Sequence, residues 1–321
     1  MCRRQNRKRL YVRRQGWVVR AMHLRNVELF CEVVSRSSFS KAAKARQMSQ
    51  SAASQAVQTL EDRLGAVLID RSQRPLSLTP AGQVYYDGCR RLLDTFRQVE
   101  EQVFAINDRV TGRLRVAAIY SVGLLQMSET VVRYREGYPD VSLQLDYLHP
   151  EEVAERVRVG DADLGILSFP RAGGDFTVVP WLEQSMTIAV PPDHRLASRD
   201  GSSGPASVEL IDGEPFVGFC GDLRVRRRID RWLKAAGVSV DVVHEFDNCE
   251  HIKRAVEVGS GVAILPEPTL RRELEQGTLV SLSLDAPDWK RPLGFIHRRN
   301  RQLTTAAERF IERLLESTHG Q

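Results

Sequence analysis

The sequence predicts an α/β protein with a small, mostly helical head at its amino-terminal end. Three observations lead to this fold class. Apolar residues recur at helical spacing from residue 24 to residue 65, a heptad-like seam follows from 85 to 110, and from residue 112 short apolar runs alternate with helical patterns. With 321 residues, of which 42% are hydrophobic, the chain can form two or three domains with cores of their own.

The bulk composition predicts a cytoplasmic protein with no membrane span. The sequence has no run of about 18 apolar residues, and its basic start lacks the apolar stretch of a signal peptide. The five cysteines are widely separated and include no C-x-x-C pair, which argues against a disulfide framework. We therefore expect reduced thiols, no resident cofactor and no metal.

The net charge of +5 comes from the first 21 residues. They hold eight of the 46 Lys and Arg residues and none of the 41 Asp and Glu residues, so the rest of the chain is slightly acidic. A well-patterned helix follows Met22. We interpret residues 1–21 as a basic disordered leader or a misassigned start, with an arm that reaches along DNA phosphates as the alternative.

Residues 22–82 predict a head built on three helices. The first runs from about Leu24 to Ser35 with one apolar face, and Ser38 caps a short second helix whose alanines let another helix pack closely. The third begins at Ser49. One of its faces is apolar and the other is polar without being charged, with side chains from Ser51, Ser54, Gln55 and Gln58.

This uncharged polar face predicts contact with nucleic acid. A short helix, a tight turn and a helix with a hydrogen-bonding face form a helix-turn-helix. Gln can pair with adenine edges, and Ser can donate to bases or phosphates. Residues 36–74 hold seven bases against three acids, so the local field is positive. Apolar runs around Arg71 and Arg74 fit a two-stranded wing. The alternative is a Ser/Gln-rich solvent face.

Four short patterns make the prediction specific. They are Ser-Phe-Ser-x-Ala-Ala from residue 38, Ser-Gln-Ser-Ala-x-Ser from 49, Leu-Glu-x-x-Leu-Gly from 60 and Leu-Thr-x-Ala-Gly from 78. With them, residues 24–82 resemble the winged helix-turn-helix of LysR-type transcriptional regulators. The resemblance implies DNA contacts from Ser38, Ser49, Gln50, Ser51, Ser54, Gln55 and Gln58, with the third helix in the major groove, and from Arg71 and Arg74 on the backbone or in the minor groove. Arg46 and Gln55 depart from the family pattern; we expect Arg46 to loosen the turn and Gln55 to weaken phosphate binding or alter base preference.

Residues 83–111 predict a linker and dimerisation helix. Its seam alternates steps of four and three through Tyr85, Cys89, Leu92, Phe96, Val99, Val103, Ile106 and Val110. A single helix hardly buries such a seam, so we expect a homodimer that presents two heads to double-stranded DNA with an interrupted dyad. The alternative is an amphipathic helix packed inside one chain.

Residues 112–321 predict an effector-binding domain of two Rossmann-like α/β lobes. Strands such as "RLRVAAIY" and "ADLGILS" alternate with helices, the first from Val122 to Gly137, which implies a mostly parallel sheet with right-handed crossovers. We place lobe I at about 112–188 and 288–318, and lobe II at about 189–287. The family resemblance implies an effector domain similar to type 2 periplasmic solute-binding proteins, with the last strand and helix returning to lobe I.

Polar residues at the ends of these strands predict a ligand cleft between the lobes. Small ligands in such folds lie beyond the carboxyl ends of parallel strands, beside helix N-termini. Each candidate could instead be an ordinary cap or turn residue. By resemblance, the residues that line the cleft are Tyr120, Ser121, Ser168, Phe219, Cys220 and Asn248.

Two other chemistries have weaker signals. His244, Cys249, His251 and Cys220 include metal-ligand types, but their spacing offers no convincing fourth ligand. A redox switch at Cys220 is the other alternative, because a thiol at a helix N-terminus has a lowered pKa, although no resolving cysteine is evident.

The sequence therefore predicts a regulator and not an enzyme. It contains no G-x-S-x-G elbow, P-loop or H-E-x-x-H pattern. We expect a LysR-type regulator whose DNA binding or bending is controlled by a small-molecule effector, acting as dimers that assemble into tetramers and alter contact with RNA polymerase. The alternative is an effector-independent architectural or nucleoid protein.

Overall fold

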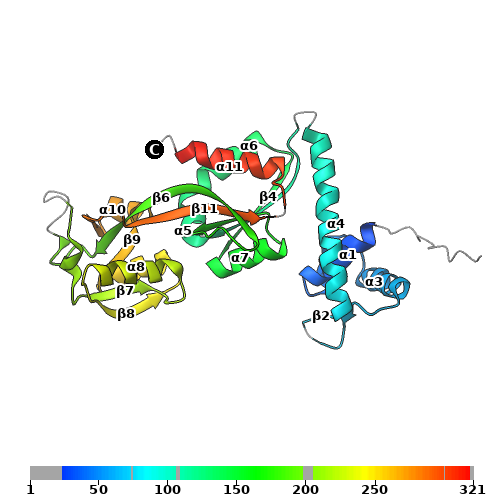
Figure 1. Ribbon diagram of the computed structural model, residues 1–321, viewed down its shortest axis with the longest axis horizontal. Helices are drawn as coiled ribbons and strands as arrows, with labels where there is room; N and C mark the ends of the chain where they lie inside the picture. The colour runs from blue at the N-terminus through cyan, green and yellow to red at the C-terminus, as the bar shows by residue number, and fades with distance from the viewer. Residues whose placement is uncertain (1–23, 74, 106–108, 198–204, 300, 319–321) are drawn as a thin grey trace, which may run out of the picture. The chain divides into compact units, whose positions relative to one another are not determined.

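The computed structural model describes residues 24–73, 75–105, 109–197, 205–299 and 301–318. The chain divides into two compact units, residues 1–97 and 98–321 (Figure 1). The predicted leader, 1–21, lies outside the described residues. Within the described part, no helix is long and apolar enough to cross a membrane.

The first unit contains the predicted helix-turn-helix and wing. Its elements are α1 (Leu24–Ser35), α2 (Phe39–Ala45), α3 (Gln50–Leu64), β1 (Ile69–Asp70), β2 (Ser77–Leu78) and the start of α4 (Pro80–Ala105). The strands β1 and β2 pair antiparallel, which confirms the wing. All three short helices contribute to one core that includes Phe30, Ala42 and Val57. The small side chains of α2 are buried, as the close packing of neighbouring helices requires.

Local side chains set the ends of the helices in the head. The Ser38 hydroxyl accepts a hydrogen bond from the Lys41 amide at 3.3 Å, and the Ser49 hydroxyl accepts one from the Ala52 amide at 3.1 Å. Gly65 ends α3 in the left-handed conformation, with φ of 66°. The predicted starts of the second and third helices are therefore confirmed.

The exit from the wing into α4 requires a glycine. A β carbon at position 82 would lie 1.9 Å from the Leu68 carbonyl oxygen, which no side chain tolerates. The Thr79 hydroxyl donates to the Val67 carbonyl at 2.7 Å and accepts from the Gly82 amide at 2.9 Å. These contacts give the Leu-Thr-x-Ala-Gly pattern its physical reason.

The predicted seam along α4 is divided. Tyr85 and Cys89 pack against the core of the head, so they are not part of an open seam. The helix begins at Pro80, inside the predicted head, and ends at Ala105. Ile106 lies outside the described residues, and Val110 packs in lobe I, so the seam is shorter than predicted. Four apolar residues of α4 remain 42–54% exposed: Leu92, Phe96, Val99 and Val103.

The sheet of the second unit is mixed, so the prediction of a mostly parallel sheet is wrong. Seven strands follow the order β10-β6-β11-β5-β3-β4, with β9 paired to β6. The strands are β3 (Gly112–Ile119), β4 (Val141–Leu148), β5 (Leu164–Ser168), β6 (Phe176–Val190), β9 (Ala263–Pro266), β10 (Val280–Ser283) and β11 (Lys290–Arg298). Among its described strands, only β3 makes parallel pairs, with β4 and β5. The two long strands β6 and β11 pair antiparallel, because the chain leaves lobe I along one and returns along the other.

One predicted helix of the second unit is divided in two, and some short helices were not predicted. The remaining elements are α5 (Tyr120–Gln126), α6 (Ser128–Gly137), α7 (Pro150–Val159), α8 (Arg224–Ala235), α9 (Cys249–Glu257), α10 (Arg271–Gln276), α11 (Thr305–Thr318), the 3-10 turns η2 (Val208–Ile211) and η3 (Glu267–Leu270), and the parallel pair β7 (Pro215–Phe219) and β8 (Asp241–Phe246). The single helix expected from Val122 to Gly137 is two helices, broken at Met127, whose side chain is fully buried in lobe I.

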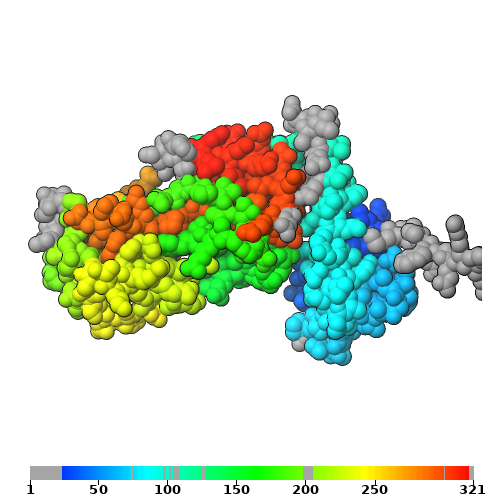
Figure 2. Space-filling view, in the orientation of Figure 1, coloured from blue at the N-terminus to red at the C-terminus, as the bar shows by residue number. Residues whose placement is uncertain are grey.

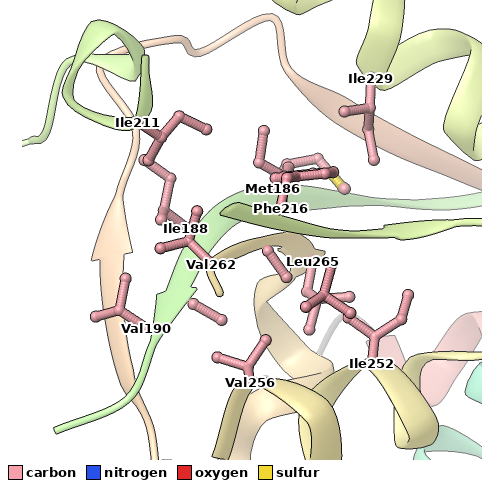
Figure 3. Packing of buried hydrophobic residues seen from close by; sticks show 14 of the residues in the cluster. Met186, Ile188, Val190, Ile211, Phe216, Ile229, Ile252, Val256, Val262 and Leu265 are labelled. Atoms are coloured by element: carbon pink, nitrogen blue, oxygen red, sulfur yellow. The ribbon is translucent and has the colours of Figure 1, made fainter. Parts of the chain in front are cut away.

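Two hydrophobic cores define the lobes. Figure 1 shows the long strands β6 and β11 running side by side from one lobe to the other, and Figure 2 shows the surface in the same orientation. On β6, Leu182 packs in lobe I and Met186 in lobe II; on β11, Leu293 packs in lobe I, and Trp289, just before the strand, packs against lobe II. On β6 the change from the first core to the second thus falls between Leu182 and Met186. Figure 3 shows Met186 and Ile188 of β6 among the residues of that core.

Candidate functional site

The outer face of α3 is the first candidate site. Ser49, Gln50, Ser51, Gln55 and Gln58 are exposed and Ser54 is half-buried. The opposite face, which includes Ala53, Val57 and Leu60, is buried. The predicted separation of an apolar and an uncharged polar face is confirmed, so this surface can offer amides and hydroxyls to a ligand.

Weak local hydrogen bonds hold these side chains in place. The Ser40 hydroxyl donates to Gln50 Oε1 at 2.8 Å, the Ser49 and Ser51 hydroxyls lie 2.9 Å apart, and Gln58 Nε2 donates to Asp62 at 2.9 Å. All these bonds lie at the exposed surface. Such bonds have small net free energies and can be exchanged for bonds to another partner.

Glu61 joins the wing to α3, and the sequence analysis did not single it out. Its side chain is only 4% exposed. Its Oε1 accepts from the Leu68 and Ile69 amides at 2.8 and 3.1 Å, and its Oε2 accepts from Arg71 Nη2 at 2.8 Å. The acidic residue of the Leu-Glu-x-x-Leu-Gly pattern therefore fixes where the wing lies against the helix.

Arg71 links three elements of the head. Besides Glu61, it donates from Nη1 to the Ser54 hydroxyl at 3.2 Å, and its guanidinium carbon lies 5.3 Å from the centre of the Phe39 ring. Its side chain keeps 36% exposure, which leaves part of the charge at the surface. Arg74 lies outside the described residues.

Arg46 does not loosen the turn between α2 and α3, as the sequence analysis expected. Its Nη1 pairs with Glu28 Oε2 at 2.9 Å, which ties the end of α2 to α1. The expectation failed because the compensating carboxylate comes from α1, 18 residues earlier in the chain.

The second candidate site is a pocket of about 200 Å³ between the two lobes. The carboxyl ends of β3, β5 and β7 meet the starts of α5, α7, α8 and α9 there. Five of the six predicted residues line it: Tyr120, Ser121, Ser168, Phe219 and Asn248. The side chain of Asn248 also caps α9, since its Oδ1 accepts from the His251 amide at 3.0 Å.

Cys220 does not line this pocket, and the expectation of a lowered pKa is wrong. Burial raises the pKa of the Cys220 thiol, and the carboxylates of Asp222, Asp247 and Glu245 raise it further. The thiol gains nothing from the N-terminus of α8, because that helix begins only at Arg224. A thiol in such a setting is a poor nucleophile.

The metal alternative finds no support in the described part of the chain. No group of three or more His, Cys, Asp or Glu residues is arranged there to hold a metal ion. Cys249 is 2% exposed and packs in the core of lobe II.

Arg291 also lines the pocket, and it was not among the residues predicted from the sequence. The residue is 2% exposed. Its Nε and Nη2 donate to Gln184 Oε1 at 2.9 and 2.5 Å, and its Nη1 donates to the Ser121 hydroxyl at 3.1 Å. Burial lowers the pKa of Arg291, with Cys249 opposing the shift. The only signal in the sequence is a charged residue directly before the apolar run of the last strand.

A winged helix-turn-helix joined to a two-lobed unit with a pocket between the lobes defines a DNA-binding transcriptional regulator with a ligand-binding domain. Residues 24–83 match the family described as "Bacterial regulatory helix-turn-helix protein, lysR family", and residues 107–318 match the "LysR substrate binding domain". The chain belongs to the LysR family of transcriptional regulators.

Known relatives are similar over nearly the whole chain. The HTH-type transcriptional regulator CysL of Bacillus subtilis is 26% identical over 295 residues, which cover 92% of this chain and 97% of CysL. A full-length OxyR variant from Pseudomonas aeruginosa has a TM-score of 0.73 at 22% identity and covers 92% of this chain and 94% of its own. Full-length CbnR complexed with its target DNA has a TM-score of 0.62 at 19% identity, and the match covers 92% of this chain and 100% of the CbnR chain. The two structures show that the fold is shared.

Proposed function

We propose that this regulator reads DNA with the uncharged face of α3 and that a small molecule in the interlobe pocket controls how it does so. The observation that carries the first part is the exposed row of amides and hydroxyls on a helix-turn-helix of the LysR family. The fold is shared with CbnR, which has been seen on its target DNA. We place the protein in the cytoplasm, where its DNA is.

The DNA contacts divide by chemistry. Amides and hydroxyls of α3 suit base edges in the major groove, whereas arginines of the wing suit phosphates or the minor groove. Ser38, at the start of α2, suits a phosphate. The residues we assign to DNA are Ser38, Ser49, Gln50, Ser51, Ser54, Gln55, Gln58, Arg71 and Arg74.

A second copy of the chain supplies the partner for α4. The exposed side chains of Leu92, Phe96, Val99 and Val103 follow the heptad spacing that pairs helices in a coiled coil. Two heads paired in this way fit a DNA site with an interrupted dyad. We propose further assembly to tetramers through the effector domains.

Control by an effector follows from the pocket. A ligand there contacts both lobes, so it favours one lobe arrangement over another, and this shifts DNA bending and the contact with RNA polymerase. Tyr120, Ser121, Ser168, Phe219 and Asn248 are the proposed effector contacts. An architectural DNA-binding protein would bind DNA in the same way but would not respond to a ligand.

Selection from random duplex DNA tests the first part. The full chain should enrich sequences with an interrupted dyad, and Gln50→Ala should change the enriched half-site. Gln83→Ala is the matched control, because Gln83 is exposed but lies on α4. Enrichment of the same sequences by the Gln50→Ala variant would show that Gln50 reads no base.

A thermal-shift screen of the full chain against metabolites tests the second part. A bound ligand raises the melting temperature, and the same compound should then change the footprint on a selected DNA site. A compound that binds in the pocket and leaves the footprint unchanged would favour the architectural alternative.

A further inference from the structure

A buried guanidinium lies where the two lobes join, and its charge is not balanced. Two hydrogen-bond acceptors of Arg291 are neutral groups, Gln184 Oε1 and the Ser121 hydroxyl. Its other electrostatic neighbour is the Cys249 thiol, whose pKa is raised by burial, so that this group is a neutral thiol too. In the part of the chain that the structure describes, no carboxylate forms an ion pair with Arg291.

Such a charge is unfavourable unless something compensates it. Arginine keeps its proton at any physiological pH, so burial cannot neutralise it. An ion taken out of water needs an opposite charge or a full set of hydrogen bonds. Beside it, Gln184 Nε2 is a buried donor with no acceptor among the described residues. A cation without a counter-charge and a donor without an acceptor therefore lie at one place.

The position of Arg291 connects it to both lobes. Arg291 and Gln184 are direct partners across β11 and β6, between the residues that pack in lobe I and those that pack in lobe II. Ser121 belongs to α5 of lobe I, and Cys249 is the first residue of α9 in lobe II. A group bound to Arg291 therefore sits at the junction.

The rest of the pocket lining carries charges of both signs, Glu151 among them. Asp222 lies 3.7 Å from His149, and Asp247 accepts a hydrogen bond from Asn248 at 2.7 Å. Arg224 and Arg227 also line the pocket, and burial together with Arg171 and Arg227 lowers the pKa of Arg224. The lining around Arg291 is thus mixed in sign, and Arg291 is the charged residue in it that is almost fully buried.

We propose that the effector carries a small oxyanion group, a carboxylate or a phosphate-like or sulfate-like group, that binds Arg291 and so links the two lobes. Two oxygens of such a group match the fork of N–H donors on a guanidinium. The pocket volume of about 200 Å³ suits a small metabolite. This inference rests on the proposed function, because it assumes that the interlobe pocket is the effector site.

Thermal unfolding of the full chain tests the inference with sodium acetate, sodium phosphate and sodium sulfate, each compared with sodium chloride at equal ionic strength. At least one arm should raise the melting temperature of the wild type by about 3 °C over chloride, and the responding arm identifies the kind of oxyanion. Arg291→Met should lose that rise. Arg271→Gln should keep it, because Arg271 is exposed on α10 and does not line the pocket.

Equal shifts in the wild type and in Arg291→Met, or no shift in any arm, would overturn the proposal. Arg291→Lys keeps the charge without the fork and should retain a smaller rise, so it serves if Arg291→Met does not fold. DNA binding measured without added oxyanion distinguishes a failure of this inference from a failure of the proposed DNA-binding function. Normal binding to a selected site with no oxyanion response would remove this inference and leave DNA reading in place.

Discussion

Two buried charges of the effector unit differ in what balances them. Asp163, just before β5, accepts from Arg115 Nη2 at 2.8 Å and from Arg301 Nη1 at 2.9 Å. Burial acts to raise the pKa of Asp163, but the two arginines outweigh it and hold the pKa below its usual value. Arg291 has only neutral partners among the described residues. The difference teaches that a balanced buried charge belongs to the fold, whereas an unbalanced one indicates a binding site.

The largest expected effect comes from removing the balanced charge. Asp163→Asn should lower the free energy of unfolding by about 3–5 kcal/mol, because it leaves two arginines without their shared carboxylate. Arg291→Met should remain within about 1 kcal/mol of the wild type, since it removes an unbalanced charge. Chemical denaturation of the full chain, followed through the transition of the effector unit, measures both. Equal losses would break the comparison.

Lowering the pH should remove the stabilisation that the ionised Asp163 carboxylate provides. Because the pKa of Asp163 is lower in the folded than in the unfolded chain, its contribution is present above its ordinary pKa of 3.8 and is lost as the pH falls below it. The unfolding midpoint of the wild type should therefore decline more steeply between about pH 5 and pH 3 than that of Asp163→Asn. Parallel curves would show that the arginine pairs do not shift this carboxylate.

Removing the buried carboxylate of Glu61 in the head should have the next largest effect on stability. Glu61→Ala removes the acceptor of two backbone amides and the carboxylate that pairs with Arg71 Nη2, so we expect the head to lose about 2–3 kcal/mol and to bind all DNA sequences more weakly. Glu32→Ala is the control, because Glu32 of α1 forms a more exposed pair with Arg36, just after that helix. If the two variants unfold alike, Glu61 does not hold the wing.

An exposed polar group should affect recognition and not folding. Gln50→Ala should reduce the preference for a selected site over random DNA by about 1–3 kcal/mol. Its free energy of unfolding should change by less than about 0.5 kcal/mol, because water replaces the bond from Ser40. Competition binding and denaturation measure the two quantities. A fall in stability with no change in preference would assign Gln50 to the fold.

The smallest effect should come from a pair near the surface. Arg46→Ala should cost less than about 1 kcal/mol, because Arg46 and Glu28 are each 29% exposed and solvent screens their attraction. Thermal unfolding of the head checks this value. A larger loss would mean that the turn between α2 and α3 depends on this ion pair.

The sequence predicted those features that depend on neighbouring residues. Ser38 and Ser49 cap the helices that their positions indicated, and the two faces of α3 follow from helical spacing alone. The strand direction of the sheet could not be derived in this way. β6 and β11 are separated by 99 residues along the chain, from Val190 to Lys290, and nothing local shows that they pair.

The location of the pocket could be predicted from a general rule of α/β folds, but only some of its lining residues could. The rule that ligands lie beyond strand ends located Ser121, Ser168 and Phe219. It could not locate Arg291, whose role depends on Gln184 of another strand and on the absence of a described carboxylate partner. It also misjudged Cys220, because the pKa of that thiol depends on where α8 begins and on carboxylates brought near by folding.

The two long strands have a consequence for synthesis of the protein. Lobe I needs β11 and α11, which are translated after the residues from Met186 to Trp289 that build the core of lobe II. Translation therefore releases a complete set of lobe II residues while lobe I still lacks a central strand. Lobe I begins to be made first but is completed after lobe II. Until β11 is added, the sheet of lobe I has an exposed edge, and such an edge promotes aggregation unless the chain is completed quickly.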